Sequence, residues 1–238
     1  MVYVIADIHG SALSLQQDMK YMPELTEDDY IIIAGDAGLE YGQYSMGSLK
    51  KYMKKFPCTF VVMRGNHDNR YHYMARNNPD RWSFTDDEMY AYENKYPNIL
   101  YVKDSGGVYT IDGKDILFIP GAYSVDKYYR LANGLAYEPR EELSWFEADG
   151  LFIEIDNKHF DYVVSHTAPL SLVPRLEHLF LAQVDQGCVS HWTEKICDEV
   201  YMNYNFKHWY FGHFHSDMEL SDNVTMVYAK FGVIGSDE

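Results

Sequence analysis

Histidines and carboxylates recur directly after apolar runs along this chain. The stretch "YFGHFHS", residues 210–216, places His213 and His215 two residues apart, with only Phe214 between them. Other apolar runs end in side chains of the same kinds: Asp7, His9, Asp36, Asn66, His67, Asp68 and His166. The set therefore combines carboxylates, an amide and imidazoles, all of which bind metal ions in proteins.

The mixture of ligand types narrows the chemistry. Hard oxygen donors mixed with imidazoles suit manganese, iron, zinc or similar ions better than calcium or magnesium, which prefer oxygen ligands alone. The candidate ligands are too numerous for one metal ion. Two ions that share one carboxylate would account for them. Two ions about 4 Å apart form a device for in-line displacement at phosphorus. Each residue alone also has a structural explanation, such as a helix cap, a turn or a core histidine.

The elements that must position these side chains are apolar strands. Residues 2–6, 30–34 and 59–63 are apolar and are each followed by polar residues, and "DYVVSHTAP" and "HWYFGHFHS" repeat the pattern. In layered α/β folds, ligands bind beyond the carboxyl ends of strands, where loops from several strands converge. We therefore expect the candidate ligands to meet at one edge although they span the chain.

The fold class follows from the remaining patterns. The sequence "VYTIDGKDILFIP" consists of two β-rich runs around Asp112 and Gly113, which predicts a hairpin, and "NVTMVYAKFG" predicts a late strand. Helical spacing is found in residues 12–22 and 191–204. An α/β fold is expected, with two mixed sheets packed face to face and helices outside.

Two stretches are predicted to be additions to this framework. Residues 69–97 are rich in Tyr, Asn, Arg and Asp, and residues 122–145 carry Lys127, Arg130 and several tyrosines. Each stretch is interpreted either as a lid or specificity loop or as a solvated surface excursion. Lys127 and Arg130 are candidate substrate contacts.

Composition limits the partners and the location. The 238 residues carry a formal net charge of −16, which weighs against binding to long nucleic acid or to anionic membranes. No apolar segment is long enough to span a bilayer and no leader pattern is present, so a cytoplasmic protein is predicted. The three cysteines, Cys58, Cys188 and Cys197, lack metal-finger spacing and are expected to be reduced.

The ordered blocks "DIHG", "GDAG", "GNHD", "SHTAP" and "GHFH" resemble those of the calcineurin-like metallophosphoesterase superfamily. As a whole, the sequence is similar to those of small bacterial or phage-type phosphoesterases related to phosphoprotein phosphatases. The resemblance implies one domain over residues 1–238 with a four-layer α/β/β/α sandwich. It also implies a dinuclear phosphoesterase, most simply a phosphomonoesterase, that hydrolyses esters by attack of a metal-bridging hydroxide.

The resemblance also implies a role for each residue. The first ion would be held by Asp7, His9, Asp36 and His215, and the second by Asp36, Asn66, His166 and His213, with Asp36 as the bridge. Among the catalytic residues, His67 would protonate the leaving oxygen, Asp68 would hydrogen-bond to the His67 ring, and Arg64 would bind the phosphate.

The sequence departs from that of phosphoprotein phosphatases at one place, and this leaves the class of substrate undetermined. Phosphoprotein phosphatases usually continue after Gly35 and Asp36 to an arginine that binds phosphate, whereas this chain reads "GDAGLEYG". The substrate is predicted to be a phosphorylated small molecule or protein. Two alternatives are a phosphodiesterase acting on cyclic nucleotides or dinucleotides, and a catalytically silent interaction module. The presence of His67 and of every expected ligand weighs against the silent module.

Overall fold

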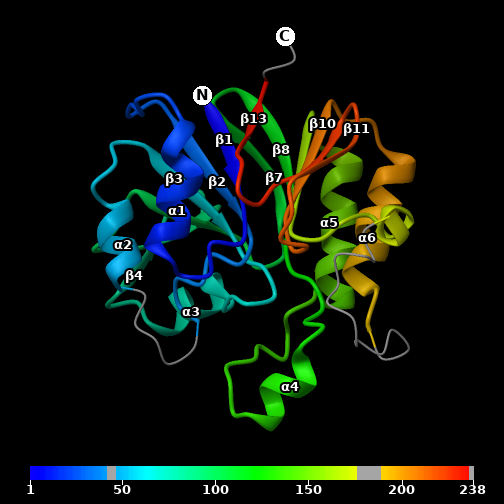
Figure 1. The fold of residues 1–238 in the computed structure, drawn as a ribbon, viewed down its shortest axis with the longest axis horizontal. Coiled ribbons are helices and arrows are strands. Elements are labelled where there is room, and N and C mark those ends of the chain that lie inside the picture. The colour runs from blue at the N-terminus through cyan, green and yellow to red at the C-terminus, as the bar shows by residue number, and fades with distance from the viewer. Residues whose placement is uncertain (42–46, 176–188, 236–238) are drawn as a thin grey trace.

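The computed structural model describes residues 1–41, 47–175 and 189–235 and contains two β-sheets flanked by helices (Figure 1). The first sheet has the strand order β13 (Gly232–Ile234), β1 (Val2–Ile5), β2 (Tyr30–Ala34), β3 (Thr59–Met63), β6 (Ile99–Val102), β5 (Tyr90–Glu93) and β4 (Trp82–Phe84). The second has the order β11 (Met218–Ser221), β12 (Val224–Met226), β10 (His208–Phe211), β9 (Tyr162–Ser165), β8 (Lys114–Ile119) and β7 (Gly107–Ile111).

Helices cover the outer face of each sheet (Figure 1). The first sheet packs against α1 (Ala12–Asp18), α2 (Gly47–Met53) and α3 (Tyr71–Asn77), and the second against α5 (Trp145–Asn157) and α6 (Trp192–Asn203). The short 3-10 helices η1 (Met19–Tyr21) and η2 (Leu170–Arg175) follow α1 and β9. These layers confirm the predicted α/β sandwich with two mixed sheets.

Alternation along the strands divides the apolar side chains between two layers. In β1, Val2 and Val4 face the core between the sheets, whereas Tyr3 and Ile5 face the helices of the first sheet. A strand points successive side chains to opposite faces, so a strand with both faces covered must be apolar throughout. This requirement explains the uninterrupted apolar runs in the sequence.

The central strands run parallel, which places their carboxyl ends at one edge. β1, β2, β3 and β6 are parallel neighbours in the first sheet, as are β8, β9, β10 and β12 in the second. The antiparallel pair β7 and β8 is the predicted hairpin, with Asp112 and Gly113 at positive φ in its turn. The polar residues that follow β1, β2, β3, β9 and β10 are thereby brought to the same end of the sandwich.

The two additional stretches have different structures. Residues 69–97 supply α3 and the strands β4 and β5, which extend the first sheet at its edge, so the expectation of a lid or surface excursion is wrong for them. Residues 122–145 leave the sheet after β8, form α4 (Lys127–Ala132) and return to α5. Figure 1 shows α4 projecting away from the body of the molecule.

Buried thiols belong to the apolar cores. Cys58 and Cys197 are free and buried, and burial raises the pKa of both, that of Cys58 to about 12. Cys188 lies outside the described residues. Among the described residues, no helix has the length and apolar character needed to cross a membrane.

Candidate metal centre

The seven predicted ligands follow five strands that belong to both sheets. Asp7 and His9 follow β1, Asp36 follows β2, Asn66 follows β3, His166 follows β9, and His213 and His215 follow β10. The two sheets are joined here, because the Nδ1 atom of His166 lies 2.9 Å from the carbonyl oxygen of Ala34. The site therefore lies across the carboxyl ends of the central strands of both sheets.

One group of ligands gathers around Asp7, His9 and His215. Their candidate ligand atoms all lie within 4.8 Å of one another. The Nε2 atoms of His9 and His215 are 3.0 Å apart, and Nε2 of His215 is 3.7 Å from Oδ1 of Asp7. That Oδ1 atom is buried and has no hydrogen-bond partner among the described residues. An unpartnered buried carboxylate oxygen facing two imidazoles fits a metal cation.

A second group gathers around Asp36 and His166. Asp7, Asp36 and His166 also place their ligand atoms within 4.8 Å of one another. The Nε2 atom of His166 is 2.8 Å from Oδ1 of Asn66 and 3.4 Å from Oδ1 of Asp36. The ring of His213 is centred 5.1 Å from that of His166, and its backbone N–H donates to Oδ2 of Asp7 at 2.9 Å.

Asp36 lies between the two groups. Its Oδ1 atom faces His166, as above, and its Oδ2 atom is 3.8 Å from Nε2 of His9. One oxygen therefore faces each group of imidazoles. This is the arrangement that a carboxylate bridging two ions requires.

The backbone of the ligand residues is in a costly conformation. Five of the seven have positive φ: Asp7 (57°), His9 (44°), Asp36 (51°), His213 (72°) and His215 (50°). Left-handed conformations of residues other than glycine cluster at functional sites, where the surrounding structure holds them in place. Here the strand ends hold them, because His9 N–H donates to the carbonyl of Asp36 and Asp7 N–H to that of Gly35. These left-handed conformations are found at the residues whose side chains form the two ligand groups.

Charge in the centre is distributed as expected for a cation site. Burial raises the pKa of Asp7 to about 8. Burial would also raise the pKa of Asp36, but the charge and hydrogen bond of His166 outweigh it and hold this pKa well below its usual value. The same pairing raises the pKa of His166 to about 9 against the effect of its own burial. Two buried carboxylates compete for one positive imidazole, so the residues fit metal ions in charge as well as in ligand type.

Gly65 leaves no space beside the ligands. A Cβ atom at this position would lie 2.1 Å from Oδ1 of Asp36 and 2.6 Å from Nε2 of His166. We expect Gly65→Ala to displace both ligands and to reduce metal affinity by roughly 10- to 100-fold or more, the scale seen when ligand orientation is lost. Metal titration by calorimetry checks this. The control is Gly150→Ala, because nothing lies within 4 Å of a Cβ atom there; equal affinity in both variants would contradict the prediction.

His67 lies beside the ligands, but its predicted partner is wrong. Both oxygens of Asp68 accept hydrogen bonds elsewhere, from the backbone N–H groups of Ala37, Gly38 and Gly65 and from the hydroxyl of Tyr71. Asp68 is fully buried and fixes the loops rather than the His67 ring. The ring Nδ1 of His67 is buried without a hydrogen-bond partner among the described residues.

The acid that faces His67 is Asp126, which the sequence analysis missed. Nε2 of His67 lies 3.9 Å from Oδ1 of Asp126, and this oxygen is also buried without a hydrogen-bond partner among the described residues. The other oxygen, Oδ2, accepts from Nε of Arg130 at 2.7 Å. Asp126 immediately precedes α4, so no strand-end pattern marks it in the sequence.

Arg64 is buried in the structure, whereas the resemblance implied that it binds the phosphate. The residue is 1% exposed, and its guanidinium donates from Nε to the carbonyl of Asp104 at 3.0 Å and from Nη1 to that of Glu141 at 2.6 Å. Its Nη2 has no partner among the described residues. The side chain ties three segments together and has almost no surface with which to contact a phosphate.

Arg130 is the cation that reaches the centre. Its guanidinium lies 5.9 Å from the centre of the Tyr41 ring, which itself packs edge-on against His67. The hydroxyl of Tyr41 and Nη1 of Arg130 both donate to the carbonyl of Ala136. Burial lowers the pKa of both His9 and His67, and the charge of Arg130 acts in the same direction. The excursion of residues 122–145 thus brings an arginine beside the ligands.

These features agree with the family to which the chain matches. The calcineurin-like phosphoesterase family matches residues 1–217, and the chain belongs to this family. It is a metal-dependent phosphoric ester hydrolase. The Asp and His groups described above can hold the ions that this chemistry needs.

Solved structures with the same fold are distant in sequence. A phosphopantetheinyl hydrolase from Mycobacterium tuberculosis is 16% identical with a TM-score of 0.57, and the match covers 96% of this chain and 88% of that chain. A second solved structure is 13% identical with a TM-score of 0.53, over 95% of this chain and 88% of the other. No curated protein sequence matches the chain.

Proposed function

We propose that this protein is a phosphomonoesterase that uses two divalent ions, of which manganese, iron and zinc suit the ligands best. The observation that carries the proposal is the pair of ligand groups that share Asp7 and have Asp36 between them. Asp7, His9, Asp36 and His215 would hold one ion, and Asp36, Asn66, His166 and His213 the other. Bound there, the ions supply positive charge to the phosphoryl oxygens and activate water.

The chain's own residues supply orientation and proton transfer. Asn66 is held by its side-chain amide, which donates to the hydroxyl of Ser124 at 3.0 Å, so that its Oδ1 faces the ligands. His67 lies beside the ligands with its ring Nδ1 unpartnered among the described residues, and it is assigned as the proton donor to the leaving oxygen. Asp126 is assigned as the residue that orients His67, because its Oδ1 lies 3.9 Å from Nε2 of the ring.

Arg130 is assigned as the phosphate-binding cation in place of Arg64. Nη2 of Arg130 forms no hydrogen bond with any described residue, while Nε and Nη1 are held by Asp126 and Ala136. A fixed guanidinium with a free edge suits two phosphate oxygens. A phosphomonoester carries more negative charge than a diester, so this extra cation favours a monoester.

Removing the Arg130 guanidinium should raise KM more than it lowers kcat. We expect Arg130→Gln to raise KM by about 10- to 100-fold, the scale of one charge-assisted hydrogen bond, while metal content stays the same. Steady-state kinetics with para-nitrophenyl phosphate checks this. Arg76→Gln is the control, because Arg76 is largely exposed on α3 and pairs with Glu88. A KM equal to that of the control would remove Arg130 from the site.

The substrate is proposed to be a phosphorylated small molecule or protein, met in the cytoplasm. A phosphodiesterase acting on cyclic nucleotides or dinucleotides is the second candidate, because the ligand set serves either ester. A silent interaction module is disfavoured, since His67 and all seven ligand residues gather at one edge of the sandwich.

The decisive test compares two esters. Metal-free protein is supplied with manganese and assayed with para-nitrophenyl phosphate and with bis-para-nitrophenyl phosphate. The proposal predicts metal-dependent turnover with a preference for the monoester. Preference for the diester would select the phosphodiesterase, and silence on both esters despite bound metal would contradict the enzyme proposal.

A further inference from the structure

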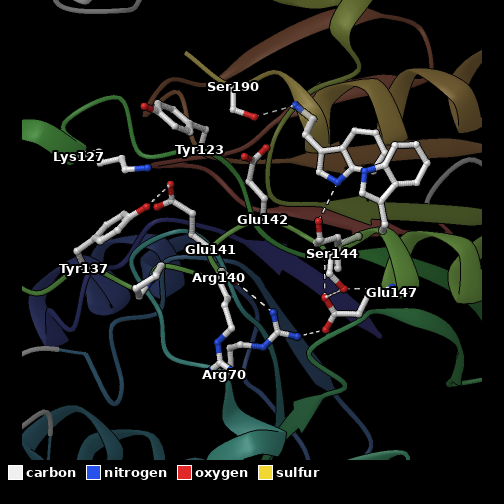
Figure 2. A pocket seen from close by; sticks show the side chains of 14 residues that line it. Arg70, Tyr123, Lys127, Tyr137, Arg140, Glu141, Glu142, Ser144, Glu147 and Ser190 are labelled. Carbon is white, nitrogen blue, oxygen red and sulfur yellow. Dashed lines mark hydrogen bonds and ion pairs between the residues drawn. The ribbon is translucent and has the colours of Figure 1, made fainter. Parts of the chain in front are cut away.

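A cavity of about 720 Å³ lies beside the metal centre, between the excursion of residues 122–145 and the starts of α5 and α6. Figure 2 shows it with Lys127, Tyr123 and Tyr137 gathered at one end and Ser144 at the other. Its size is in the range of sites for small organic molecules. None of the seven candidate ligands lines it, so it is not the metal site itself.

A chain of hydrogen bonds links the wall of the cavity to the metal centre. The Ser124 hydroxyl accepts from the Asn66 amide and donates to Oε2 of Glu141 at 2.5 Å, and Glu141 lines the cavity. Lys127, which also lines it, directly follows Asp126, the residue that faces His67. The excursion that lines the cavity therefore also supplies Asp126, which faces His67 beside the metal centre.

One wall of the cavity offers a flat aromatic surface. The Trp145 and Trp192 rings are centred 4.7 Å apart and tilted by 36°, and the indole N–H of Trp192 is fixed by the carbonyl of Leu143. Trp145 is nevertheless 75% exposed. One face of its ring is supported by the Trp192 ring, and most of the remaining surface of the side chain is exposed. A supported indole with an open face is a stacking platform for a planar ring.

The opposite end carries a cation without an acidic partner. Lys127 forms no ion pair with any described residue, and its ammonium lies 5.4 Å and 5.3 Å from the ring centres of Tyr123 and Tyr137. A hydrogen bond with Tyr137 raises the pKa of Lys127, so the charge is kept.

The acidic residues of the cavity are already engaged by protein groups. Glu141 is bonded to Ser124, Glu142 accepts from the backbone N–H of Thr193, and Glu147 pairs with Arg70. These contacts leave Lys127 as a charge available to the oxygen of a ligand.

We propose that this cavity binds the organic part of the phosphoester and selects one that contains a planar aromatic ring, which stacks on Trp145 while Lys127 binds an oxygen nearer the phosphate. The proposal rests on the phosphoesterase function above and adds a class of substrate to it. A compact aliphatic ester would leave the tryptophan wall unused.

A matched pair of substrates isolates the ring. Adenosine 5′-monophosphate and ribose 5-phosphate present the same phosphate on the same sugar and differ in the presence of the base. We expect kcat/KM to favour the adenosine ester by about tenfold or more, the scale of one base–aromatic stacking contact. Trp145→Ala should bring this ratio close to one, and Trp145→Phe should retain most of it.

Two further variants separate the contacts. Lys127→Gln should raise KM for both esters alike, because both contain the sugar and phosphate. Phe146→Ala is the matched control, since Phe146 is the next residue of α5, is 91% exposed and does not line the cavity; it should keep the wild-type ratio. Thermal unfolding of each variant shows that the fold is kept.

Failure of the subsite and failure of the phosphoesterase are distinguishable. Hydrolysis of both esters with equal kcat/KM, or a ratio unaltered by Trp145→Ala, would overturn the subsite and leave the enzyme intact. If neither ester is hydrolysed, tryptophan fluorescence titrated with adenosine 5′-monophosphate decides. Quenching that is lost in Trp145→Ala supports the subsite, and the absence of quenching overturns it.

Discussion

Asp36→Asn should lose metal and most turnover while the protein stays folded. Asparagine keeps the size of the side chain and one oxygen but removes the charge and the second oxygen that together face His9 and His166. A carboxylate bridging two ions contributes to both, so metal content should fall below two ions per chain. Turnover should fall by about 10³-fold or more, since each ion contributes several kcal/mol of charge stabilisation.

The chain offers a closely matched control for this substitution. Asp112 has φ 50°, nearly the same left-handed backbone as Asp36 at 51°, but lies in the hairpin turn between β7 and β8. Asparagine is tolerated in such turns, so Asp112→Asn should keep both metal and activity. Elemental analysis and kinetics measure both variants. An Asp36→Asn protein with two ions and wild-type turnover would exclude the bridging role.

His67→Ala should show the opposite pattern, with metal kept and turnover lost. The His67 ring lies beside the ligands, 5.6 Å from the ring of His9, but it belongs to neither group of ligand atoms. Its removal should reduce turnover by about 10²- to 10⁴-fold, the usual contribution of one general acid. Metal analysis beside single-turnover kinetics tests both halves of the prediction.

The leaving group separates proton donation from simple disruption. An ester with an acidic alcohol, such as para-nitrophenyl phosphate, needs little protonation, so His67→Ala should impair it less than an aliphatic ester. His159→Ala is the control, because His159 is 74% exposed and pairs with Asp161 on the surface. Unaltered turnover in His67→Ala on both esters would falsify the assignment.

The strand-end residues were predictable because their pattern is local. Each candidate ligand follows an uninterrupted apolar run, and parallel strands bring their carboxyl ends to one edge whatever their separation in the chain. His166 and Asn66 are 100 residues apart and still lie in hydrogen-bond contact. The hairpin at Asp112 and the two-sheet sandwich were predictable for the same reason, since turn chemistry and alternation are properties of short segments.

The residues that the sequence analysis missed are positioned by tertiary contacts instead. Asp126 faces His67 only because the excursion after β8 leaves the sheet beside the strand ends, and nothing in its local sequence indicates this. Asp68 was expected at the His67 ring, but its carboxylate accepts instead from the backbone N–H groups of Ala37 and Gly38. Backbone donors in a buried loop must find acceptors, and Asp68 satisfies them.

Arg64 and the stretch 69–97 were misjudged for a related reason. The resemblance placed Arg64 at the phosphate, and the polar composition of residues 69–97 indicated a surface excursion, whereas the structure uses the polar groups of both for internal pairing. Lys50 pairs with Glu40 and Glu93 in the outer layer of the first sheet, and Arg81 pairs with the same two acids. These pairs anchor the edge strand β4 and its neighbour β5. Buried polar groups that are fully paired cannot be told from surface groups by composition.

The central claim is a centre of two ions, and metal stoichiometry measured together with activity tests it most directly. Metal-free protein is titrated with manganese while bound metal and hydrolysis of para-nitrophenyl phosphate are recorded at each step. Activity that rises with the second equivalent and reaches its maximum at two ions per chain is the predicted result. Full activity at one ion per chain, or in the presence of excess chelator, would contradict it.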